Sequence, residues 1–544
     1  MTPTIQDCLI QFQKRAERAG DDKLIETFVD AAPLLASVST TDNQVIFGRR
    51  GTGKTHIFKY LDDSIRRNGD LSIYLDLRSV GSNSSVYNDR QRTHAQRATP
   101  LLLDVLQALH EALLEVAIDN AEEVDLSKLG PELDQLSEAI STVEVVGSVE
   151  RSVENSCTDN QQSQVEIGVD LNLDAPKFSA KATGSSGITS SNKEVLTRSG
   201  DEFFYVKFGA VQNRLKAVLG RLGARRVWLL LDEWAEVPLD IQPYLADLLR
   251  RCVLPLPQMT LKIAAIEHRS NMIIRRQGEY IGIELGADAG GDVNLDDFMV
   301  LDNDASRAKQ FFSALLFKHY RATDGLSPNI GPQSPEEFIN QTFTQITAFE
   351  EFVRAVEGVP RDAVYLASTV ATLAYGRLIS VQDVRDAART WYHRDKATVL
   401  RSAPEMNDLL HWITEEVIAH RRARAFLLTS NLRFPLIDTL FDSRLLHVLK
   451  KNISSQDNPG TRYDVYKLDY GCYVELISTS RAPGGLLPSD DGEAARYVDV
   501  PPDDYRSIRS AILDLTTFEA AQKRRATTEA AQQRRVARKG VGSY

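Results

Sequence analysis

One stretch of the sequence carries residue types that bind phosphate: Gly48, Arg49, Arg50, Gly51, Thr52, Gly53, Lys54 and Thr55. They fit the spacing G-x-x-x-x-G-K-[ST], with a short apolar run before them and a helix-compatible pattern after them. The glycines let backbone N–H groups approach phosphate oxygens, and the start of the helix adds its positive dipole end. Lys54 is expected to reach the β- and γ-phosphates, and Thr55 to bind Mg²⁺. The whole stretch therefore predicts a nucleotide site, with ATP and Mg²⁺ as cofactors.

A second chemical landmark is a pair of adjacent acids, Asp232 and Glu233, at the end of the apolar run 227–231. With a phosphate loop upstream, the pair predicts that Asp232 holds Mg²⁺ through water and that Glu233 polarises the attacking water. A solvated acidic turn is the alternative interpretation. The two motifs together predict a Mg²⁺-dependent ATPase, whose hydrolysis we expect to be slow or stimulated by a partner.

Several arginines are candidates for contact with the γ-phosphate. The strand pattern 261–266 is followed by Glu-His-Arg, and Arg269 is the residue of this trio best suited to bind phosphate. Arg361 stands at the head of a predicted helix, where a helical lid would reach back to the nucleotide. Arg275 or Arg276 is a candidate arginine finger for a neighbouring subunit of a homo-oligomer, and an ordinary surface position is an equal interpretation for both.

The elements that must position these residues alternate between strand and helix patterns. Apolar runs at 45–47, 71–77, 227–231 and 261–266 are typical of buried strands, and helical periodicity separates them. This alternation predicts an α/β fold with a parallel sheet covered on both faces. From Ser334 onwards the pattern is helical, which predicts the lid.

We expect five segments along the chain: an N-terminal helical segment at 1–42, an α/β nucleotide-binding domain at 43–325, a helical lid at 326–400, a winged-helix-like domain at 401–485 and a flexible, C-terminally basic tail at 486–544. The N-terminal segment is expected to pack on the nucleotide domain and to contribute little chemistry. In the tail, the basic run 523–539 indicates a solvated face, with non-specific nucleic-acid contact as the alternative.

The nucleotide domain contains a β-rich insertion at about 141–200, where apolar and polar residues alternate strictly at 165–173 and 178–182. One interpretation is a β-finger that touches DNA or a partner chain. The other is a surface insertion without a ligand, which is favoured because few basic or aromatic residues are present to hold a nucleic acid.

The winged-helix-like domain is predicted from helical patterns at 406–420 and 435–450, followed by an alternating β-wing at 462–476 that Gly471 interrupts. If the domain binds DNA, its second helix is expected in the major groove, with three basic residues near phosphates: Arg444, Lys450 and Lys451. Basic and acidic residues are equal in number over 405–481, so a contact with protein is an equal interpretation.

The composition sets the remaining bounds. A net charge of -11 argues against a generally basic nucleic-acid surface. The 4 cysteines are far apart and without a C-x-x-C pair, which favours neither a disulfide framework nor a metal knuckle. No apolar run has the length of a membrane span, and the polar start lacks the core of a signal peptide. We therefore expect a cytoplasmic protein that makes no contact with a membrane.

Taken together, the phosphate loop, Asp232-Glu233, the strand ending in EHRS and the lid sequence EGVPRDAVYLAS resemble an AAA+ ATPase over 44–481. Within that class the chain is most similar to the origin-recognition and initiator-type ATPases, which carry a Gly-x-x-Arg sensor 2 before a winged-helix domain. By that resemblance Arg361 is the sensor 2 arginine. The strand tip departs from the initiator pattern of Asn, Ser or Thr. With the Gly-Val-Pro of the lid, 358–360, it is similar to STAND signalling ATPases instead.

Three functional hypotheses follow from the motifs and the resemblance. The leading one is an ATP-driven, DNA-associated initiator-like switch. The second is a STAND-like signalling or anti-phage defence ATPase that controls a separate, co-encoded effector protein. The third, a P-loop kinase or transferase, leaves the lid and the winged-helix-like domain unexplained.

Overall fold

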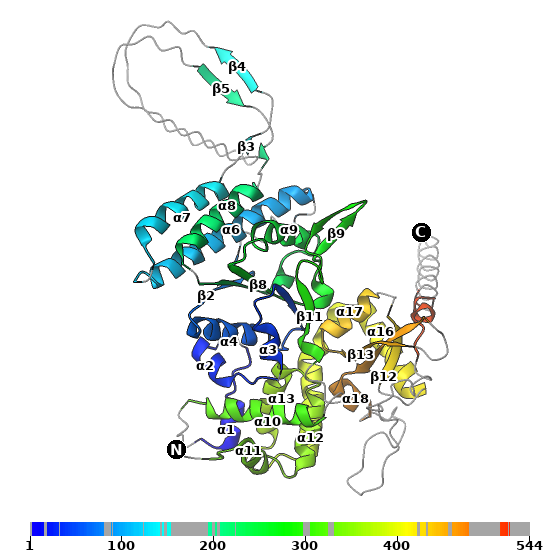
Figure 1. Cartoon of the computed structure of the whole chain (residues 1–544). Helices are drawn as coiled ribbons and strands as arrows, with labels where there is room; N and C mark the ends of the chain where they lie inside the picture. Colours follow the sequence, from blue (N-terminus) through cyan, green and yellow to red (C-terminus); the bar gives the residue numbers. More distant parts are fainter. Residues whose placement is uncertain are drawn as a thin grey trace, which may run out of the picture.

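A computed structural model describes residues 3–15, 19–31, 33–80, 87, 89, 91–122, 124–141, 144–145, 149–153, 194–198, 202–203, 207–223, 225–297, 305–324, 331–420, 425–430, 434–454, 460–477, 512–520 and 522. The alternating stretches expected at 165–173 and 178–182 and the basic run at 523–539 lie outside these residues. Figure 1 shows the nucleotide domain above the helical lid, with the C-terminal domain beside both.

The nucleotide domain is built around a five-stranded sheet in the order β11-β1-β8-β7-β2, in which every pair is parallel. The strands are β1 (Gln44–Phe47), β2 (Leu71–Asp76), β7 (Val227–Asp232), β8 (Met259–Ala265) and β11 (Gly290–Asn294). They are largely apolar because a parallel sheet is buried on both faces. The predicted parallel α/β sheet is thus confirmed. Since β1 lies between β8 and β11, a ligand crevice is expected outside its carboxyl end.

Helices cover both faces of this sheet. Helix α4 (Lys54–Arg67) packs on the face that carries Ile46 and Leu230. The other face carries Leu229 and Leu231 and packs against α6 (His94–Asp119), α7 (Leu126–Ser141), α8 (Phe208–Arg221) and α9 (Gln242–Cys252). Neighbouring residues of one strand enter different cores because side chains alternate across a strand.

The inserted segment leaves and re-enters the domain between α7 and α8 (Figure 1). It does so through two antiparallel pairs: β3 (Glu144–Val145) with β6 (Glu202–Phe203), and β4 (Val149–Val153) with β5 (Glu194–Arg198). Further along the chain, β9 (Ile273–Arg276) and β10 (Glu279–Gly282) form a separate antiparallel hairpin.

The N-terminal segment and the lid share one hydrophobic core with α4. The N-terminal helices are α1 (Ile5–Ile10), α2 (Asp21–Thr27) and α3 (Leu34–Val38). The helices that follow the sheet are α10 (Ala305–Arg321), α11 (Pro335–Thr342), α12 (Ile346–Ala355), α13 (Pro360–Leu373) and α14 (Val381–Trp391). Helix α1 contacts α13 and α2 contacts α4, so the N-terminal segment bridges the nucleotide domain and the lid.

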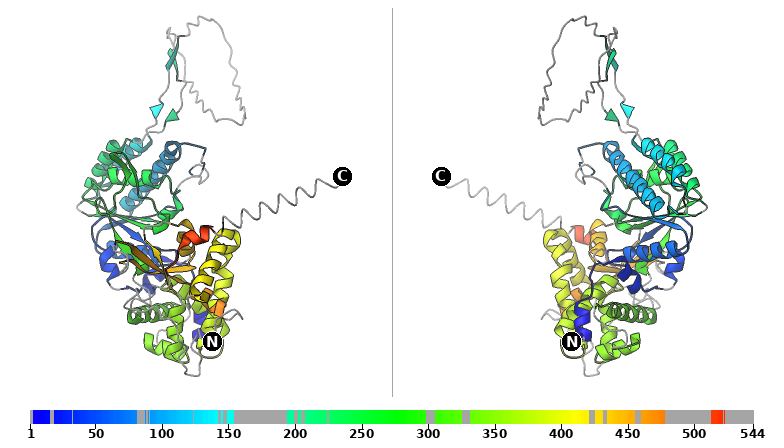
Figure 2. Two further views of the ribbon diagram at one scale, coloured as in Figure 1. Left: turned by 90° about the vertical axis from the view of Figure 1, so that its right-hand side faces the viewer. Right: turned by 90° about the vertical axis from the view of Figure 1, so that its left-hand side faces the viewer.

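The C-terminal domain begins after η5 (Tyr392–Lys396) and α15 (Thr398–Ser402). Its elements are α16 (Pro404–Thr414), η6 (Glu415–His420), β12 (Ala425–Thr429), α17 (Pro435–Asp442), β13 (Leu446–Ser454), β14 (Arg462–Leu468) and α18 (Tyr470–Ile477). The strands form a three-stranded antiparallel sheet in the order β12-β14-β13. Helices combined with this sheet give the winged-helix-like arrangement that the sequence predicted. Figure 2 shows the domain from two further sides.

Two details of the C-terminal domain correct the sequence prediction. The helix expected over 435–450 ends at Asp442, because Arg444 takes a left-handed backbone conformation (φ 62°) and β13 follows. The β-wing expected over 462–476 stops at Leu468, where Asp469 accepts a hydrogen bond from the N–H of Gly471 (3.0 Å) and caps α18.

Part of the region predicted as a flexible tail, 486–544, packs on the C-terminal domain. The N–H of Leu513 donates to the carbonyl oxygen of Leu427 (3.0 Å), at the edge of β12. A short helix over 515–520 follows, and its Phe518 is buried with its ring 5.6 Å from that of Trp412. The domain core therefore includes a segment that is distant in sequence.

We expect Phe518→Ala to lower the free energy of unfolding of the C-terminal domain by about 3 kcal/mol, because the substitution leaves a cavity beside Trp412. Urea denaturation followed by tryptophan fluorescence measures the change. The exposed neighbour provides a matched control, since Glu519→Ala should change stability by no more than about 0.5 kcal/mol. Equal stabilities of the two variants would show that this segment contributes nothing to the core.

Candidate nucleotide-binding site

The phosphate loop lies between β1 and α4, at the carboxyl edge of the sheet. Gly51 (φ 93°) and Gly53 (φ 100°) take backbone conformations that favour glycine. The Nζ atom of Lys54 donates to the carbonyl oxygens of Gly48 (2.8 Å) and Arg49 (3.0 Å). Burial lowers the pKa of this ammonium, with the nearby acids opposing the shift. The loop thus holds a desolvated amine where the sequence predicts phosphate contact.

The candidate magnesium ligands lie directly beside the loop. The hydroxyl of Thr55 donates to Asp232 Oδ2 (2.7 Å), and the hydroxyl of Tyr74 donates to the same oxygen (2.9 Å). One hydroxyl and one carboxylate fit Mg²⁺, which keeps waters and takes further oxygens from a nucleotide. The sequence did not indicate Tyr74, because a tyrosine in an apolar strand looks like an ordinary core residue.

Glu233 occupies a strained position at the end of β7. Its φ of 56° is rare for a residue with a side chain, and its side chain lines the crevice. Burial and the neighbouring Asp232 raise the pKa of Glu233, while Lys54 and Arg78 oppose the shift. The guanidinium of Arg78 lies 3.8 Å from the carboxylate. A carboxylate in this setting is suited to accept a proton or to orient water.

Arg361 is held directly against the phosphate loop. Its backbone N–H donates to the carbonyl oxygen of Gly51 (3.1 Å), and a Cβ at Gly51 would lie 2.8 Å from Arg361 Cβ. Arg361 belongs to the first turn of α13, so the amino end of this lid helix adjoins the same crevice. The structure therefore brings the predicted sensor 2 residue to the phosphate loop.

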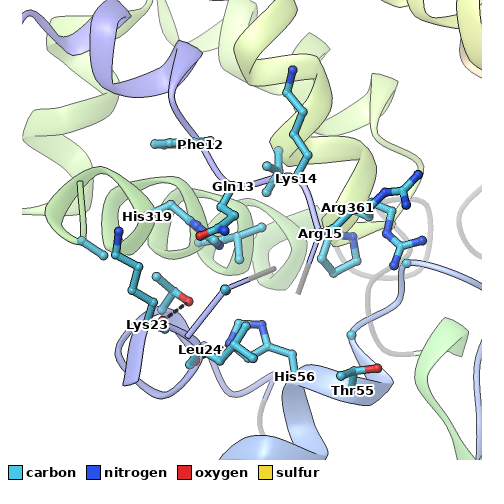
Figure 3. A pocket seen from close by; sticks show the side chains of 18 of the residues that line it. Phe12, Gln13, Lys14, Arg15, Lys23, Leu24, Thr55, His56, His319 and Arg361 are labelled. Atoms are coloured by element: carbon cyan, nitrogen blue, oxygen red, sulfur yellow. Dashed lines mark hydrogen bonds between the residues drawn. The ribbon is translucent and has the colours of Figure 1, made fainter. Parts of the chain in front are cut away.

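A cavity of about 610 Å³ connects these groups. Of the residues that the sequence predicted for the site, those that line it are Arg50, Gly51, Gly53, Lys54, Thr55, Glu233 and Arg361. Figure 3 shows Thr55 and Arg361 on one side of the cavity and Phe12 and His319 on the other. Asp232 reaches the site through its hydrogen bond with Thr55.

The N-terminal segment, which the sequence predicts to pack on the nucleotide domain and to contribute little chemistry, forms much of the opposite wall. The wall includes Gln11, Phe12, Gln13, Lys14, Arg15, Lys23, Leu24 and Thr27. These residues match no motif, and in the sequence Phe12 and Leu24 look like ordinary core residues. Their position depends on the packing of α1 and α2 across the lid and α4, which no local pattern encodes.

Two neutral histidines complete this wall. The rings of Phe12 and His319 lie 5.4 Å apart, and burial lowers the pKa of His319 to about 3. Burial also lowers the pKa of His56, whose ring lies 5.6 Å from that of Phe28. This neutral, partly aromatic part of the wall fits a flat nucleobase, while the cations Lys14, Arg15 and Lys23 line other parts of the same wall.

Arg49 belongs to the phosphate loop, but its side chain does not line the cavity. The guanidinium turns into the C-terminal domain, where it lies 4.4 Å from the ring centre of Phe441. Gly48 and Thr52 are likewise absent from the cavity wall, and Thr52 donates its hydroxyl to the carbonyl oxygen of Arg49 (2.9 Å). Gly48, Arg49 and Thr52 therefore belong to the side of the loop that faces away from the cavity.

The strand tip that follows β8 also faces the C-terminal domain. It forms η3 (Glu267–Arg269), in which the Nε atom of Arg269 lies 3.0 Å from Asp442 Oδ2 of α17. Arg269 does not line the cavity, because its guanidinium is directed to this acid rather than to the predicted phosphate site. The other expected arginines, Arg275 and Arg276, lie on β9, where Arg275 pairs with Glu284 (2.6 Å).

Comparisons with known proteins agree with the sequence motifs. Residues 12–97, which include the phosphate loop, match the family model described as ORC-CDC6-like. No curated protein matches the chain at a significant level. Within the described part of the chain, no helix combines the length and apolar character needed to cross a membrane.

Three solved structures are similar to this chain at low identity. The Orc1 protein of Aeropyrum pernix in complex with DNA gives 13% identity and a TM-score of 0.31, with 87% of this chain and 96% of that chain covered. Cdc6p from Pyrobaculum aerophilum gives 10% identity and a TM-score of 0.31, with 88% of this chain and 98% of that chain covered. Drosophila ORC bound to DNA gives 11% identity and a TM-score of 0.29, with 87% of this chain and 92% of that chain covered. The expected resemblance to origin-recognition-type AAA+ ATPases is thus confirmed by the family match over residues 12–97.

Proposed function

We propose that this protein is an ATP-binding and ATP-hydrolysing switch, associated with DNA in the manner of an initiator. The observation that carries the switch is the position of the C-terminal domain, which rests on three parts of the candidate nucleotide site; association with DNA is supported by the family match over residues 12–97. These parts are the phosphate loop, the strand tip after β8 and the lid next to Arg361. A domain placed in this way would be displaced or held according to what the site binds.

The contacts are specific and largely electrostatic. At the phosphate loop, the ring of Phe441 stacks on Arg49. At the strand tip, Lys451 pairs with Glu267 (2.5 Å), and Asp442 pairs with Arg269. At the lid, Arg444 pairs with Asp362. We call this surface of the C-terminal domain the docking face; it consists of Asp438, Phe441, Asp442, Arg444, His447 and Lys451. Each contact joins a residue of the docking face to a residue within a few positions of a predicted catalytic or binding group.

The proposed reaction uses groups already gathered around the cavity. Lys54 and Arg361 would hold the phosphates between the sheet and the lid, while Glu233 would orient water and accept its proton. Mg²⁺, when bound, would neutralise charge on the phosphate oxygens, and Thr55 with Asp232 would hold it. Because Arg361 belongs to the lid, a change in the phosphates would alter how the lid and the attached C-terminal domain sit.

The docking face also bears on the choice between DNA and protein as partner. Helix α17 carries two acids and no basic residue, and it lies against the nucleotide domain. Of the residues expected near DNA phosphates, Arg444 and Lys451 are engaged by Asp362 and Glu267. This observation favours, as the second candidate, a signalling ATPase whose C-terminal domain controls a separate effector protein. An initiator role requires the docking face to be released before it reaches DNA.

Lys54→Ala is expected to abolish ATP binding, because it removes the buried ammonium of the phosphate loop. Glu233→Gln should preserve binding while lowering hydrolysis by about 10²-fold or more, since an amide does not accept the proton. Fluorescent-nucleotide titration and phosphate release measure the two properties. Arg67→Met, an exposed change on the same helix as Lys54, is the control. Wild-type hydrolysis in Glu233→Gln would remove this residue from its proposed role.

Duplex DNA is expected to stimulate ATP hydrolysis, with an apparent affinity that falls as salt rises from about 50 to about 200 mM because phosphate contacts release counterions. A phosphate-release assay with a DNA titration at each salt concentration measures this dependence. Stimulation by a co-encoded protein, with no response to DNA at either concentration, would contradict the initiator role and support the effector-controlling alternative.

A further inference from the structure

Arg49 makes two different kinds of contact at once. Its carbonyl oxygen accepts from Lys54 Nζ inside the phosphate loop, while its side chain leaves the loop and enters the domain interface. The backbone N–H and Nε of Arg49 donate to the carboxylate of Asp296 (2.8 and 2.6 Å), and these two hydrogen bonds fix the direction in which the side chain leaves the backbone. The guanidinium then donates to the carbonyl oxygen of Leu446 (3.3 Å) and contacts His447 Nδ1 (3.0 Å). Arg49 is only 3% exposed.

The donor character of arginine determines the state of His447. A guanidinium only donates hydrogen bonds, so His447 Nδ1 must accept, and its Nε2–H donates to Asp469 Oδ2 (3.2 Å). Burial, together with the nearby cations, lowers the pKa of His447 well below its usual value, although Glu357 opposes the shift. The imidazole is therefore neutral and fixed in one tautomer.

Further buried ion pairs surround this histidine. Lys396 lies between Asp469 (2.5 Å) and Asp362 (3.1 Å), and Lys467 pairs with Glu357 (2.6 Å). The residues of this interface network come from the phosphate loop, the segment after β11, the lid, the connection η5 and the C-terminal domain. Apart from the half-exposed Asp395, which lies 3.8 Å from Arg444, the charges balance: the cations are Arg49, Lys396, Arg444 and Lys467, and the carboxylates are Asp296, Glu357, Asp362 and Asp469.

A buried network of this kind has one favourable geometry. Removing a single partner leaves a desolvated charge without compensation, which is strongly unfavourable. If the docked domain separates from the nucleotide domain, these pairs should therefore break together rather than one at a time. Within this network Arg49 is the member that belongs to the phosphate loop, and its carbonyl oxygen shares the Lys54 ammonium with Gly48.

We propose that Arg49 is a positioning residue that couples nucleotide binding at the phosphate loop to docking of the C-terminal domain. The inference rests on the proposed function, because it requires a nucleotide at Lys54. Phosphate oxygens compete with the carbonyl oxygens of Gly48 and Arg49 for the Lys54 ammonium. A loop rearranged by phosphate shifts the backbone of Arg49 and withdraws its side chain from Phe441 and His447, which weakens docking.

Hydrogen–deuterium exchange of the full chain tests this coupling directly, because α17 is covered by the nucleotide domain. In the wild-type protein, ATP should raise exchange in α17 by about fivefold or more, the range of ordinary allosteric coupling. In Arg49→Met, exchange in α17 should already be high without nucleotide, and ATP should add nothing. By reciprocity, Arg49→Met should also bind ATP more tightly by a similar factor.

Two further variants keep the test decisive. Phe441→Leu removes the ring beneath the guanidinium from the other side of the interface, so it should reproduce the exchange pattern without altering the loop. Arg67→Met removes an exposed cation from α4 and should behave as wild type. Wild-type exchange in Arg49→Met, or no response of α17 to bound ATP in the wild-type protein, would overturn the inference. Absence of any ATP binding would instead overturn the proposed function.

Protonation of His447 in acid should also weaken docking. The docked state binds fewer protons at His447 than the released state, so this residue alone should lower the docking constant about tenfold between about pH 7.5 and about pH 5.5. The charged groups that face the imidazole are Arg49, Glu357, Lys396, Lys467 and Asp469. His268 opposes this effect: burial lowers its pKa, but hydrogen bonding to Asp442 and nearby acids raise it overall.

The contribution of His447 is isolated by comparing exchange in α17 between wild type and His447→Gln across this pH range. A glutamine can accept from Arg49 and donate to Asp469 but does not titrate. The variant should therefore stay docked at neutral pH and lose the roughly tenfold acid effect. An identical pH profile in both proteins would overturn the assigned role of His447.

Discussion

The arrangement of this protein depends on one constraint: charges buried between two domains must all be paired. The interface network contains equal numbers of cations and carboxylates, and His447 joins Arg49 to Asp469 as a neutral acceptor and donor. Burying any one of these ions without its partner would be strongly unfavourable, because the desolvation of the charge would go uncompensated. Complete pairing makes the geometry of the interface specific, but it contributes little net free energy to the association of the two domains. A contact of that kind suits a domain that must be held in one place and also be released.

The residues that gather at the candidate site could be predicted from the sequence because their motifs are local. Lys54 and Thr55 follow the glycines of one loop, and Asp232 and Glu233 end one strand, so each motif carries its own geometry. Only the distance between the two motifs depends on the fold. The parallel sheet makes this distance short, because it places the carboxyl ends of β1 and β7 at one edge. The cavity wall from the N-terminal segment has no such signal, because Phe12 reaches the site only through packing on the lid.

The docking face could not be predicted from the sequence for a related reason. Basic residues near a helix in a winged-helix pattern indicate DNA when the surface is free, and nothing in the residues around Arg444 reveals that Asp362 will meet it. The partner lies 82 positions away and belongs to another domain. The acids of α17 offered a better signal, since Asp438 and Asp442 would repel DNA phosphates. Their partners are His268 and Arg269, the residues at the strand tip that depart from the initiator pattern.

That departure at the strand tip and the docking of the C-terminal domain have one physical explanation. A small polar residue at the tip would serve a phosphate, but it could not pair with the acids of α17. Arg269 instead directs its positive charge to the docking face, and the ring of His268 faces the same acids, while Arg361 and Lys54 remain on the cavity side. The cations near the phosphate loop are thus divided between the cavity and the C-terminal domain. The phosphate loop itself contributes Arg49 to the second group, so under the proposed coupling a nucleotide and the domain would compete for the geometry of one short loop. Each would change the affinity of the other only by as much as its own affinity differs between the two positions of the loop.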